Sequence, residues 1–157
     1  GGTMRQTVII LPWLVAVVLA GCGASPPVDE AILARGRTLY NNSCAACHQL
    51  DGEGKPGVAS PLARSSWVVG PEERLVRIAL HGVRGGIEVR GKMYNLEMPG
   101  FQYVFTKDED MATVLTYVRS AWGNSASEVT AQTVATVRKE FASRGDSWTA
   151  QDLLAVE

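Results

Sequence analysis

The longest apolar run in the chain lies near its amino end, from Val8 to Ala20, and is interrupted at Pro12. It covers 13 residues, fewer than the ~20 that a helix needs to cross a bilayer. Arg5 precedes the run and small residues follow it, which is the pattern of a secretory signal. We therefore predict a signal peptide over residues 1–21. The alternative is a buried helix, for which the mixture of proline and β-branched residues is unfavourable.

Helical periodicity begins after a short segment rich in proline. Residues 29–42 are predicted as the first helix, because two acidic residues stand at its start and favour the positive end of the helix dipole. Gly36, Tyr40 and Cys44 recur at intervals of four along one face. A glycine inside a helix costs ~1 kcal/mol relative to alanine. Gly36 therefore indicates either close approach of another helix or simple tolerance.

Three later segments also have helical patterns. Residues 71–80 begin with proline, which suits a first helical turn. Thr106 and Glu109 have the spacing of a capping box, so a helix should start near Lys107. A further helix is predicted over residues 128–143, before a last short segment to Val156. The apolar positions of these two later helices are Met111, Val114, Leu115, Val118 and Trp122, and then Val129, Thr133, Val134, Val137 and Phe141.

The pattern between these helices is weaker. Residues 87–89 and 93–94, on either side of Arg90-Gly91, are compatible with a small β-hairpin. The sequence as a whole predicts an all-α fold of several helices with this possible hairpin and a helical extension at the carboxyl end.

Composition limits the classes of function. The 157 residues include 15 Lys and Arg against 16 Asp and Glu, and this balance excludes a protein that coats nucleic acid. A hydrophobic content of 46% can support a core and excludes an acidic disordered chain. The length suits one domain with an extension.

The motif Cys44-Ala45-Ala46-Cys47-His48 carries the most specific chemistry. Cys-x-x-Cys-His is the attachment signature of c-type haem. Two thiols at this spacing can each add to one vinyl group of the haem, and the adjacent His48 then supplies the proximal imidazole to the iron. Attachment takes place outside the cytoplasm, in agreement with the predicted export signal.

Two alternatives for this motif are a redox-active dithiol and a zinc site. A dithiol of thioredoxin type follows a strand in a βαβ unit, whereas here a helix is predicted before Cys44. A zinc site would use Cys44, Cys47, His48 and His81, but the chain has no second close pair of ligands. The third cysteine, Cys22, lies at the end of the predicted signal and is assigned to lipid attachment below. No thiol is then left over, so we predict one covalent haem c.

The second axial ligand of the iron is predicted to be Met98. It lies in Met98-Pro99-Gly100-Phe101, an irregular stretch that can turn a side chain inward, and a thioether raises the reduction potential of the iron. Met93 is the second choice, and Met111 fits the core of a helix. His81 precedes Gly82 at a helix end, where a capping or packing role is favoured over iron ligation.

The end of the signal, Leu19-Ala20-Gly21-Cys22, resembles a bacterial lipobox. Cleavage before Cys22 would allow a diacylglycerol to be attached to its sulfur, and the acyl chains would anchor the protein to a membrane. The alternative is a chance cysteine in an ordinary signal. If Cys22 carries the lipid, residues 22–28 form a lipidated tether that reaches at most roughly 25 Å.

The chain resembles the class I cytochrome c domain family over about residues 29–124. The resemblance rests on Gly36 and Tyr40 before the Cys-x-x-Cys-His motif, Gly52-x-Gly54, Pro61-Leu62, Leu80-His81-Gly82, Met98-Pro99 and Leu115 to Arg119. It is more narrowly similar to the cytochrome domains found with quinoprotein-type dehydrogenases, through Pro61-Leu62-x-x-Ser65-x-Trp67 and Tyr117 to Asn124. Gly100 is a departure, since many members have Pro or Ala there.

The resemblance implies a cytochrome c fold around one haem, with domain boundaries at 29–124 and an extension over 125–157. It implies that the helix from Lys107 crosses the first helix at Gly36, with Tyr40 and Tyr117 near the junction. The extension either packs back on the domain, which we favour, or docks a dehydrogenase subunit through Trp148.

The resemblance also implies roles for residues around the haem. A backbone carbonyl at Pro61 would hold the His48 imidazole and make it more electron-rich. Trp67 would pack on the haem edge or donate its indole N–H to a propionate. Arg84, Arg90 and Tyr94 are further candidates for the propionates, with ordinary core or surface roles as the alternative.

The function implied is one-electron transfer and not enzymatic catalysis, at a haem with both axial positions filled. The protein would be periplasmic and lipid-anchored, with the inner or outer membrane left open. It would accept electrons from a periplasmic dehydrogenase and pass them to an oxidase or another cytochrome through small, transient contacts. The alternatives are a haem-based sensor or peroxidase-like enzyme with a displaceable Met98, and an obligate haem subunit of a dehydrogenase or oxidase complex.

Overall fold

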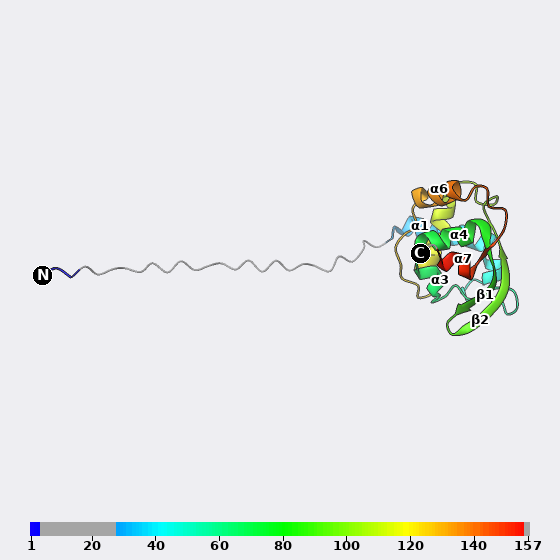
Figure 1. The fold of residues 1–157 in the computed structure, drawn as a ribbon, viewed down its shortest axis with the longest axis horizontal. Coiled ribbons are helices and arrows are strands. Elements are labelled where there is room, and N and C mark those ends of the chain that lie inside the picture. Colours follow the sequence, from blue (N-terminus) through cyan, green and yellow to red (C-terminus); the bar gives the residue numbers. More distant parts are fainter. Residues whose placement is uncertain (4–27, 156–157) are drawn as a thin grey trace.

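The computed structural model describes residues 1–3 and 28–155. The apolar run of the predicted signal peptide and the predicted lipid-attachment residue Cys22 lie outside the described residues. Within those residues, no helix combines the length and the apolar character needed to cross a bilayer. The folded part consists of helices packed beside a small sheet (Figure 1).

Helices α1 (Glu30–Ser43) and α5 (Asp108–Ser120) cross closely. The crossing is centred on Gly36, where a Cβ would lie 2.6 Å from both the carbonyl oxygen of Thr113 and the Cβ of Tyr117. Gly36 is therefore required by close approach of a second helix, and the predicted crossing is confirmed. The ring centroids of Tyr40 and Tyr117 are 5.7 Å apart at this junction.

Both α1 and α5 start where the sequence predicts, but the capping of α5 differs from the prediction. Asp29 is the N-cap of α1, and its side chain accepts a hydrogen bond from the backbone N–H of Ala31 at 2.7 Å. The predicted capping box of α5 is wrong, because the N-cap is Lys107 and its side chain makes no capping bond. Three acidic residues in the first turn, Asp108 to Asp110, stabilise the amino end instead through the helix dipole.

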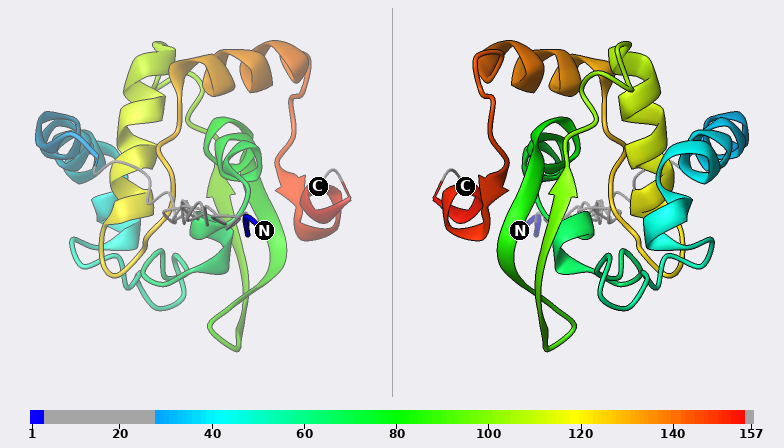
Figure 2. Two further views of the ribbon diagram at one scale, coloured as in Figure 1. Left: turned by 90° about the vertical axis from the view of Figure 1, so that its left-hand side faces the viewer. Right: turned by 90° about the vertical axis from the view of Figure 1, so that its right-hand side faces the viewer.

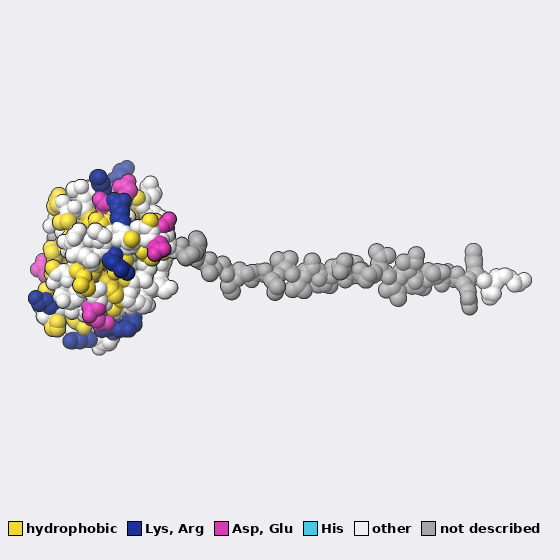
Figure 3. Space-filling view, turned by 180° about the vertical axis from the view of Figure 1, so that it is seen from behind, with side chains coloured by type: hydrophobic (Ala, Val, Ile, Leu, Met, Phe, Trp, Pro, Cys, Tyr) yellow, Lys and Arg dark blue, Asp and Glu magenta, His cyan; other side chains and the backbone are white. Residues whose placement is uncertain are grey.

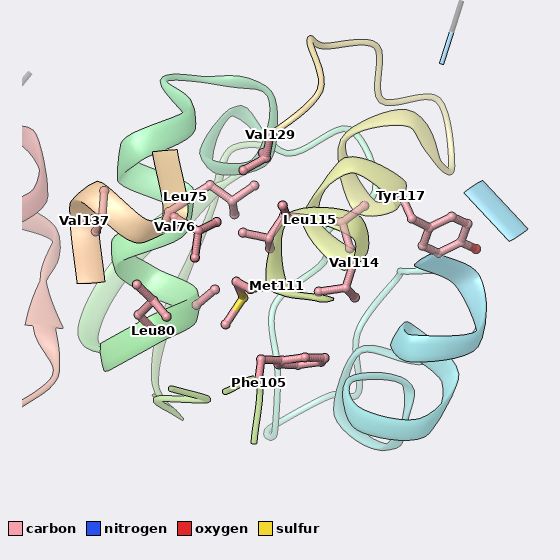
Figure 4. Close-up of a cluster of buried hydrophobic side chains, with 14 of the residues drawn as sticks. Leu75, Val76, Leu80, Phe105, Met111, Val114, Leu115, Tyr117, Val129 and Val137 are labelled. Carbon is pink, nitrogen blue, oxygen red and sulfur yellow. The ribbon is translucent and has the colours of Figure 1, made fainter. Parts of the chain in front are cut away.

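The main core lies between α4 (Glu72–His81), α5 and the helix α6 (Ala131–Glu140). Figure 4 shows its buried side chains meeting between these helices. The residues with the least exposure in this cluster are Tyr40, Val68, Val76, Leu80, Met111, Val134 and Val137. Two short helices, α2 (Ala45–His48) and α3 (Ser66–Val69), belong to the long connection between α1 and α4.

A three-stranded sheet with the order β2-β1-β3 corrects the all-α prediction. Strands β1 (Gly82–Val89) and β2 (Lys92–Pro99) form an antiparallel hairpin, and β3 (Trp148–Thr149) pairs with β1 in parallel. The hairpin turn is Arg90-Gly91, with φ values of 52° and 75°, as a two-residue turn of type I′ requires. The predicted hairpin is therefore present but much longer than expected.

The carboxyl-terminal extension packs back on the domain, as favoured. Helix α6 lies against α4 and α5 (Figure 2), and α7 (Ala150–Leu154) lies against β1. Trp148 is 4% exposed, and its ring centroid lies 5.0 Å from that of Phe141. The alternative of Trp148 as an exposed docking anchor is wrong, since the ring forms part of a second core cluster with Ile78, Val83 and Leu153.

Candidate haem-binding site

A single large cleft brings together the predicted site residues of the described chain. Its empty space is about 960 Å³ including the open mouth, which is enough for a sizeable cofactor. Cys44, Cys47, His48, Pro61, Trp67 and Met98 all line it. Most of the remaining lining is apolar and comes from β1, β2 and the connection between α2 and α4.

The two cysteines lie where α1 gives way to the short helix α2. The backbone N–H of Cys44 donates to the carbonyl of Tyr40 at 2.8 Å, and Cys44 then leaves the line of α1. One turn of helix carries Cys47 and His48 back toward the same cleft. Cys44 is half-buried and Cys47 is exposed. Burial, followed by the nearby Cys47, raises the pKa of the Cys44 thiol to about 11, so this thiol is protonated at neutral pH.

His48 is buried and held by one backbone hydrogen bond. Its Nδ1 lies 3.1 Å from the carbonyl oxygen of Ser60, so the proton belongs on Nδ1 and Nε2 keeps a free lone pair. Burial lowers the pKa of His48, against the smaller opposite effect of the Ser60 hydrogen bond. The ring is therefore neutral at pH 7, as a metal ligand must be.

The Ser60 carbonyl corrects the role predicted for Pro61. The accepting oxygen belongs to the peptide bond that joins Ser60 to the proline nitrogen, one residue earlier than expected. Because proline has no N–H of its own, this peptide unit offers the cleft an acceptor alone. Pro61 itself is buried in the cleft wall.

Backbone hydrogen bonds fix the connection between α2 and α4, which carries Ser60. The N–H of Gly54 donates to the His48 carbonyl at 3.0 Å, and the N–H groups of Leu62 and Ala63 both donate to the Gly52 carbonyl, at 2.8 and 3.0 Å. Gly52 has φ of 68°, and a Cβ there would meet the ring of Trp122 at 2.5 Å. The Gly52-x-Gly54 pattern is thus explained by positive φ and close packing.

Met98 reaches the cleft from β2 and not from an irregular stretch, which corrects that part of the prediction. It lies opposite Val83 of β1, and both residues line the cleft. Because side chains alternate along a strand, Tyr94, Leu96 and Met98 share the inner face. Glycine is required beside this position, since a Cβ at Gly82 would collide with the Met98 carbonyl oxygen.

The other proposed ligands lie elsewhere. Met93 is 61% exposed on the opposite face of β2, and Met111 is 1% exposed in the main core, as predicted. His81 is buried in the last turn of α4 and does not line the cleft. Among residues 1–3 and 28–155, no group of three or more His, Cys, Asp or Glu is placed to hold a metal ion, so the zinc alternative has no support.

Of the candidates for the haem edge, Trp67 and Tyr94 line the cleft, whereas Arg84 and Arg90 do not. Trp67 lines the cleft, but its indole N–H donates to the Glu88 carbonyl at 3.0 Å, so the predicted donation to a propionate is replaced by a tie to β1. Tyr94 also lines the cleft, whereas Arg84 is exposed on the outer face of β1. Arg90 forms an ion pair with Glu53.

Several lining residues were missed by the sequence reasoning. Val83, Ile87 and Val89 of β1 and Leu96 of β2 form much of one wall. Their alternation with polar residues was the available signal, but Gly85 and Gly86 interrupt it. The Ser60 carbonyl had no signal in side-chain chemistry, because a backbone group carries the contact.

The comparison with protein families agrees with this geometry. The model of the family Cytochrome c matches residues 33–122 of the 157. The chain belongs to the cytochrome c family. This cytochrome is a class I monohaem protein, and its cofactor is one covalently bound haem c. The cleft fits that group, since it offers two thiols, an imidazole and a thioether within a largely apolar lining.

Relatives of this cytochrome include a cytochrome c-552 and cytochrome subunits of a dehydrogenase and an oxidase. It is 40% identical to cytochrome c-552 of Thermus thermophilus over 96 residues, which cover 59% of this chain and 71% of that protein. It is 35% identical over 112 residues to the gluconate 2-dehydrogenase cytochrome c subunit of Pantoea cypripedii, covering 67% of this chain and 24% of that subunit. It is 30% identical over 96 residues to the cbb3-type cytochrome c oxidase subunit CcoP of Cereibacter sphaeroides, covering 60% and 29%.

Proposed function

We propose that this cytochrome transfers single electrons at a haem whose two axial positions are filled by His48 and Met98. The observation that carries the proposal is the convergence of these two side chains, from α2 and β2, on one cleft that Cys44 and Cys47 also line. When bound, haem c supplies the change between ferric and ferrous iron. The residues of the chain supply attachment, ligation and shielding.

Each residue has a defined part in this proposal. The thiols of Cys44 and Cys47 would hold the haem through two thioethers, each formed by addition of S–H across a vinyl group, with the thiol hydrogen on the other vinyl carbon. The Ser60 carbonyl holds Nδ1–H of His48 and leaves Nε2 for the iron. Met98 offers a soft sulfur that favours the reduced state. With both His48 and Met98 bound, the iron would have no free position for a substrate.

The test is protein-film voltammetry of the haem-loaded cytochrome. We expect one reversible one-electron wave whose shape does not change when CO is added at neutral pH. Rapid CO binding to the reduced protein, or turnover of hydrogen peroxide at the electrode, would instead support the sensor or peroxidase-like alternative, in which Met98 is displaced.

The partners proposed are a periplasmic dehydrogenase as donor and an oxidase or another cytochrome as acceptor. The support is that relatives include the gluconate 2-dehydrogenase subunit and the cbb3-type oxidase subunit. The net charge is −1, and on the face shown in Figure 3 charges of both signs are scattered among hydrophobic side chains. Such a surface suits small, transient contacts. A stable monomer in gel filtration would contradict the alternative of an obligate subunit.

We also propose that the protein is exported and that a lipid is attached at Cys22. The motif Leu19-Ala20-Gly21-Cys22 supports this proposal. Mass spectrometry of the protein from bacterial membranes should show an amino-terminal diacylated cysteine. The Cys22→Ser variant should appear in the soluble periplasmic fraction with its haem attached. Equal membrane retention of both forms would contradict lipid anchoring.

A further inference from the structure

The hairpin that carries Met98 is attached to the rest of the domain at two ends. At its base, the N–H groups of Phe101 and Gln102 donate to the carbonyls of Ala79 and Leu80 of α4, at 2.9 and 3.2 Å. The base is therefore fixed to a core helix by backbone hydrogen bonds. Toward the tip, the hairpin is held by contacts with the connection between α2 and α4.

Glu53 makes the contact at the tip itself. Both terminal nitrogens of the Arg90 guanidinium donate to its carboxylate, Nη1 to Oε1 at 3.1 Å and Nη2 to Oε2 at 2.7 Å. Arg64 donates to the same carboxylate, Nη2 to Oε1 at 3.0 Å. A two-point pair of arginine and carboxylate is directional as well as attractive, and it joins the hairpin turn to the segment that follows His48.

Both arginines stand at unusual backbone positions. Arg90 and Arg64 each have φ of 52°. This is the left-handed region, which residues other than glycine, asparagine and aspartate rarely adopt. At the turn, asparagine or glycine would fit the backbone better than arginine. Backbone strain of this kind persists where the surrounding contacts hold it, and the shared contact here is the Glu53 carboxylate.

The strand beside this contact covers the cleft. Tyr94 and Leu96 follow the turn and line the cleft on the way to Met98. Glu53, Lys92 and Tyr94 also border a smaller hollow between the strand and residues 53–59. Separation of the Arg90 and Glu53 side chains would remove the polar tie across this hollow and let the strand lift from its tip.

We propose that Glu53 and Arg90 are positioning residues that strap the hairpin closed over the haem and so limit the dissociation of Met98 from the iron. The inference rests on the proposed ligation by Met98. The indole of Trp67, bound to the Glu88 carbonyl at 3.0 Å, is the second tie at this end. The strap is a surface feature, since the side chains of Arg90 and Glu53 are 34% and 41% exposed.

The exposure of the pair makes the strap sensitive to salt. Exposed ion pairs are screened as the Debye length falls from about 30 Å at 0.01 M salt to about 3 Å at 1 M. High salt should therefore open the hairpin of the native protein, whereas it should leave a protein without the pair unchanged.

The experiment is stopped-flow CO binding to the reduced, haem-loaded protein, with the variants Glu53→Gln, Arg90→Gln and the double variant. CO can bind once Met98 has left the iron. We expect each single variant to bind CO about two- to five-fold faster at low salt, the range for one exposed pair, and the double variant to be no faster than either. The rate of the native protein should rise with salt toward that of the variants.

Two matched controls separate the strap from general charge effects. Arg64→Gln removes an ion pair to the same carboxylate but does not touch the hairpin. Arg35→Gln removes the pair with Asp110, between α1 and α5. Both should keep the native CO rate. In addition, hydrogen exchange of the amides of residues 91–95 should accelerate in Glu53→Gln and Arg90→Gln alone.

The outcomes distinguish the strap from the proposed function. Native rates and native exchange in Glu53→Gln and Arg90→Gln, or equal acceleration in Arg64→Gln, would overturn the strap. If the native protein shows no sulfur-to-iron absorption band, ligation by Met98 fails. The exchange of the tip amides then still decides whether Glu53 and Arg90 hold the hairpin closed.

Discussion

His48 and Met98 are positioned by neighbours whose own side chains have little chemistry. The ring of His48 is set by the backbone carbonyl of Ser60, and the Met98 backbone can lie close to Gly82 because Gly82 has no side chain. Such contacts are made by the backbone and depend on where the chain turns. They explain why the residues around the haem are harder to predict than the ligands themselves.

Replacement of Gly36 by alanine tests the closest helix contact. The added Cβ would lie 2.6 Å from the Thr113 carbonyl oxygen and from the Tyr117 Cβ, so α1 and α5 would have to separate. We expect the Gly36→Ala variant to lose about 1–3 kcal/mol of unfolding free energy, measured by denaturant titration of the haem-loaded protein. Gly145→Ala, which has open space around the new methyl group, is the control, and equal losses would contradict the account.

Replacement of Tyr40 by phenylalanine tests the bond that links α1 to the segment after His48. The Tyr40 hydroxyl donates to the Gln49 carbonyl at 2.6 Å, and the ring is fully buried. We expect Tyr40→Phe to lower the unfolding free energy by about 1 kcal/mol. Tyr103 is 86% exposed, so Tyr103→Phe should change nothing. A neutral result at Tyr40 would show that the hydrogen bond contributes no stability.

At the scale of elements, the helices were largely predictable and the sheet was not. The first helix was placed within one residue of α1, because a charged start and a repeat of four are local features. The hairpin of residues 82–99 was underestimated, since Gly85 and Gly86 break the alternation that marks a strand. Strand β3, which pairs with β1, is distant from it in the sequence. Local patterns therefore could not predict this pairing.

The carboxyl-terminal helix gives a test at this scale. Val137 of α6 is 1% exposed against the main core, whereas Thr136 faces solvent. Removal of two buried methyl groups and the cavity that follows should cost about 2 kcal/mol of unfolding free energy in Val137→Ala. Thr136→Ala should stay within about 0.5 kcal/mol of the native value. If both variants unfold alike by thermal denaturation, α6 does not contribute to the core as described.

At the scale of the whole molecule, the extension closes the structure around α4. Its polar contribution is the environment of His81, whose side chain is buried. Burial, and then the nearby Arg144 and Arg138, lower the pKa of His81, while a backbone bond at Arg144 and the charge of Asp146 oppose the shift. The native fold therefore holds this histidine neutral.

This arrangement predicts a dependence of stability on pH. Because the pKa of His81 is lower in the folded state than its unfolded value of about 6.5, the unfolded state binds more protons. The stability contributed by neutral His81 is present above about pH 6.5 and is lost as pH falls. We expect the unfolding free energy to fall between about pH 7.5 and 5 and to fall less in His81→Gln. Parallel pH profiles for the two proteins would contradict this role.

The site as a whole was predictable to the extent that covalent chemistry fixes it. The Cys-x-x-Cys-His motif named Cys44, Cys47 and His48, and the structure places them with Met98 around one cleft. Trp67 lines the cleft, but its indole N–H donates to the Glu88 carbonyl, and the Arg90 guanidinium pairs with Glu53. Sequence spacing does not show which of several polar partners a surface arginine or an indole will reach.

The most direct test of the account is the absorption spectrum of the ferric, haem-loaded protein beside those of Met98→Ala and Met93→Ala. Ligation by His48 and Met98 predicts a far-red sulfur-to-iron band in the native protein. The band should persist in Met93→Ala and disappear in Met98→Ala. A native spectrum without the band, or a band that survives in Met98→Ala, would contradict the ligation on which the proposed electron transfer depends.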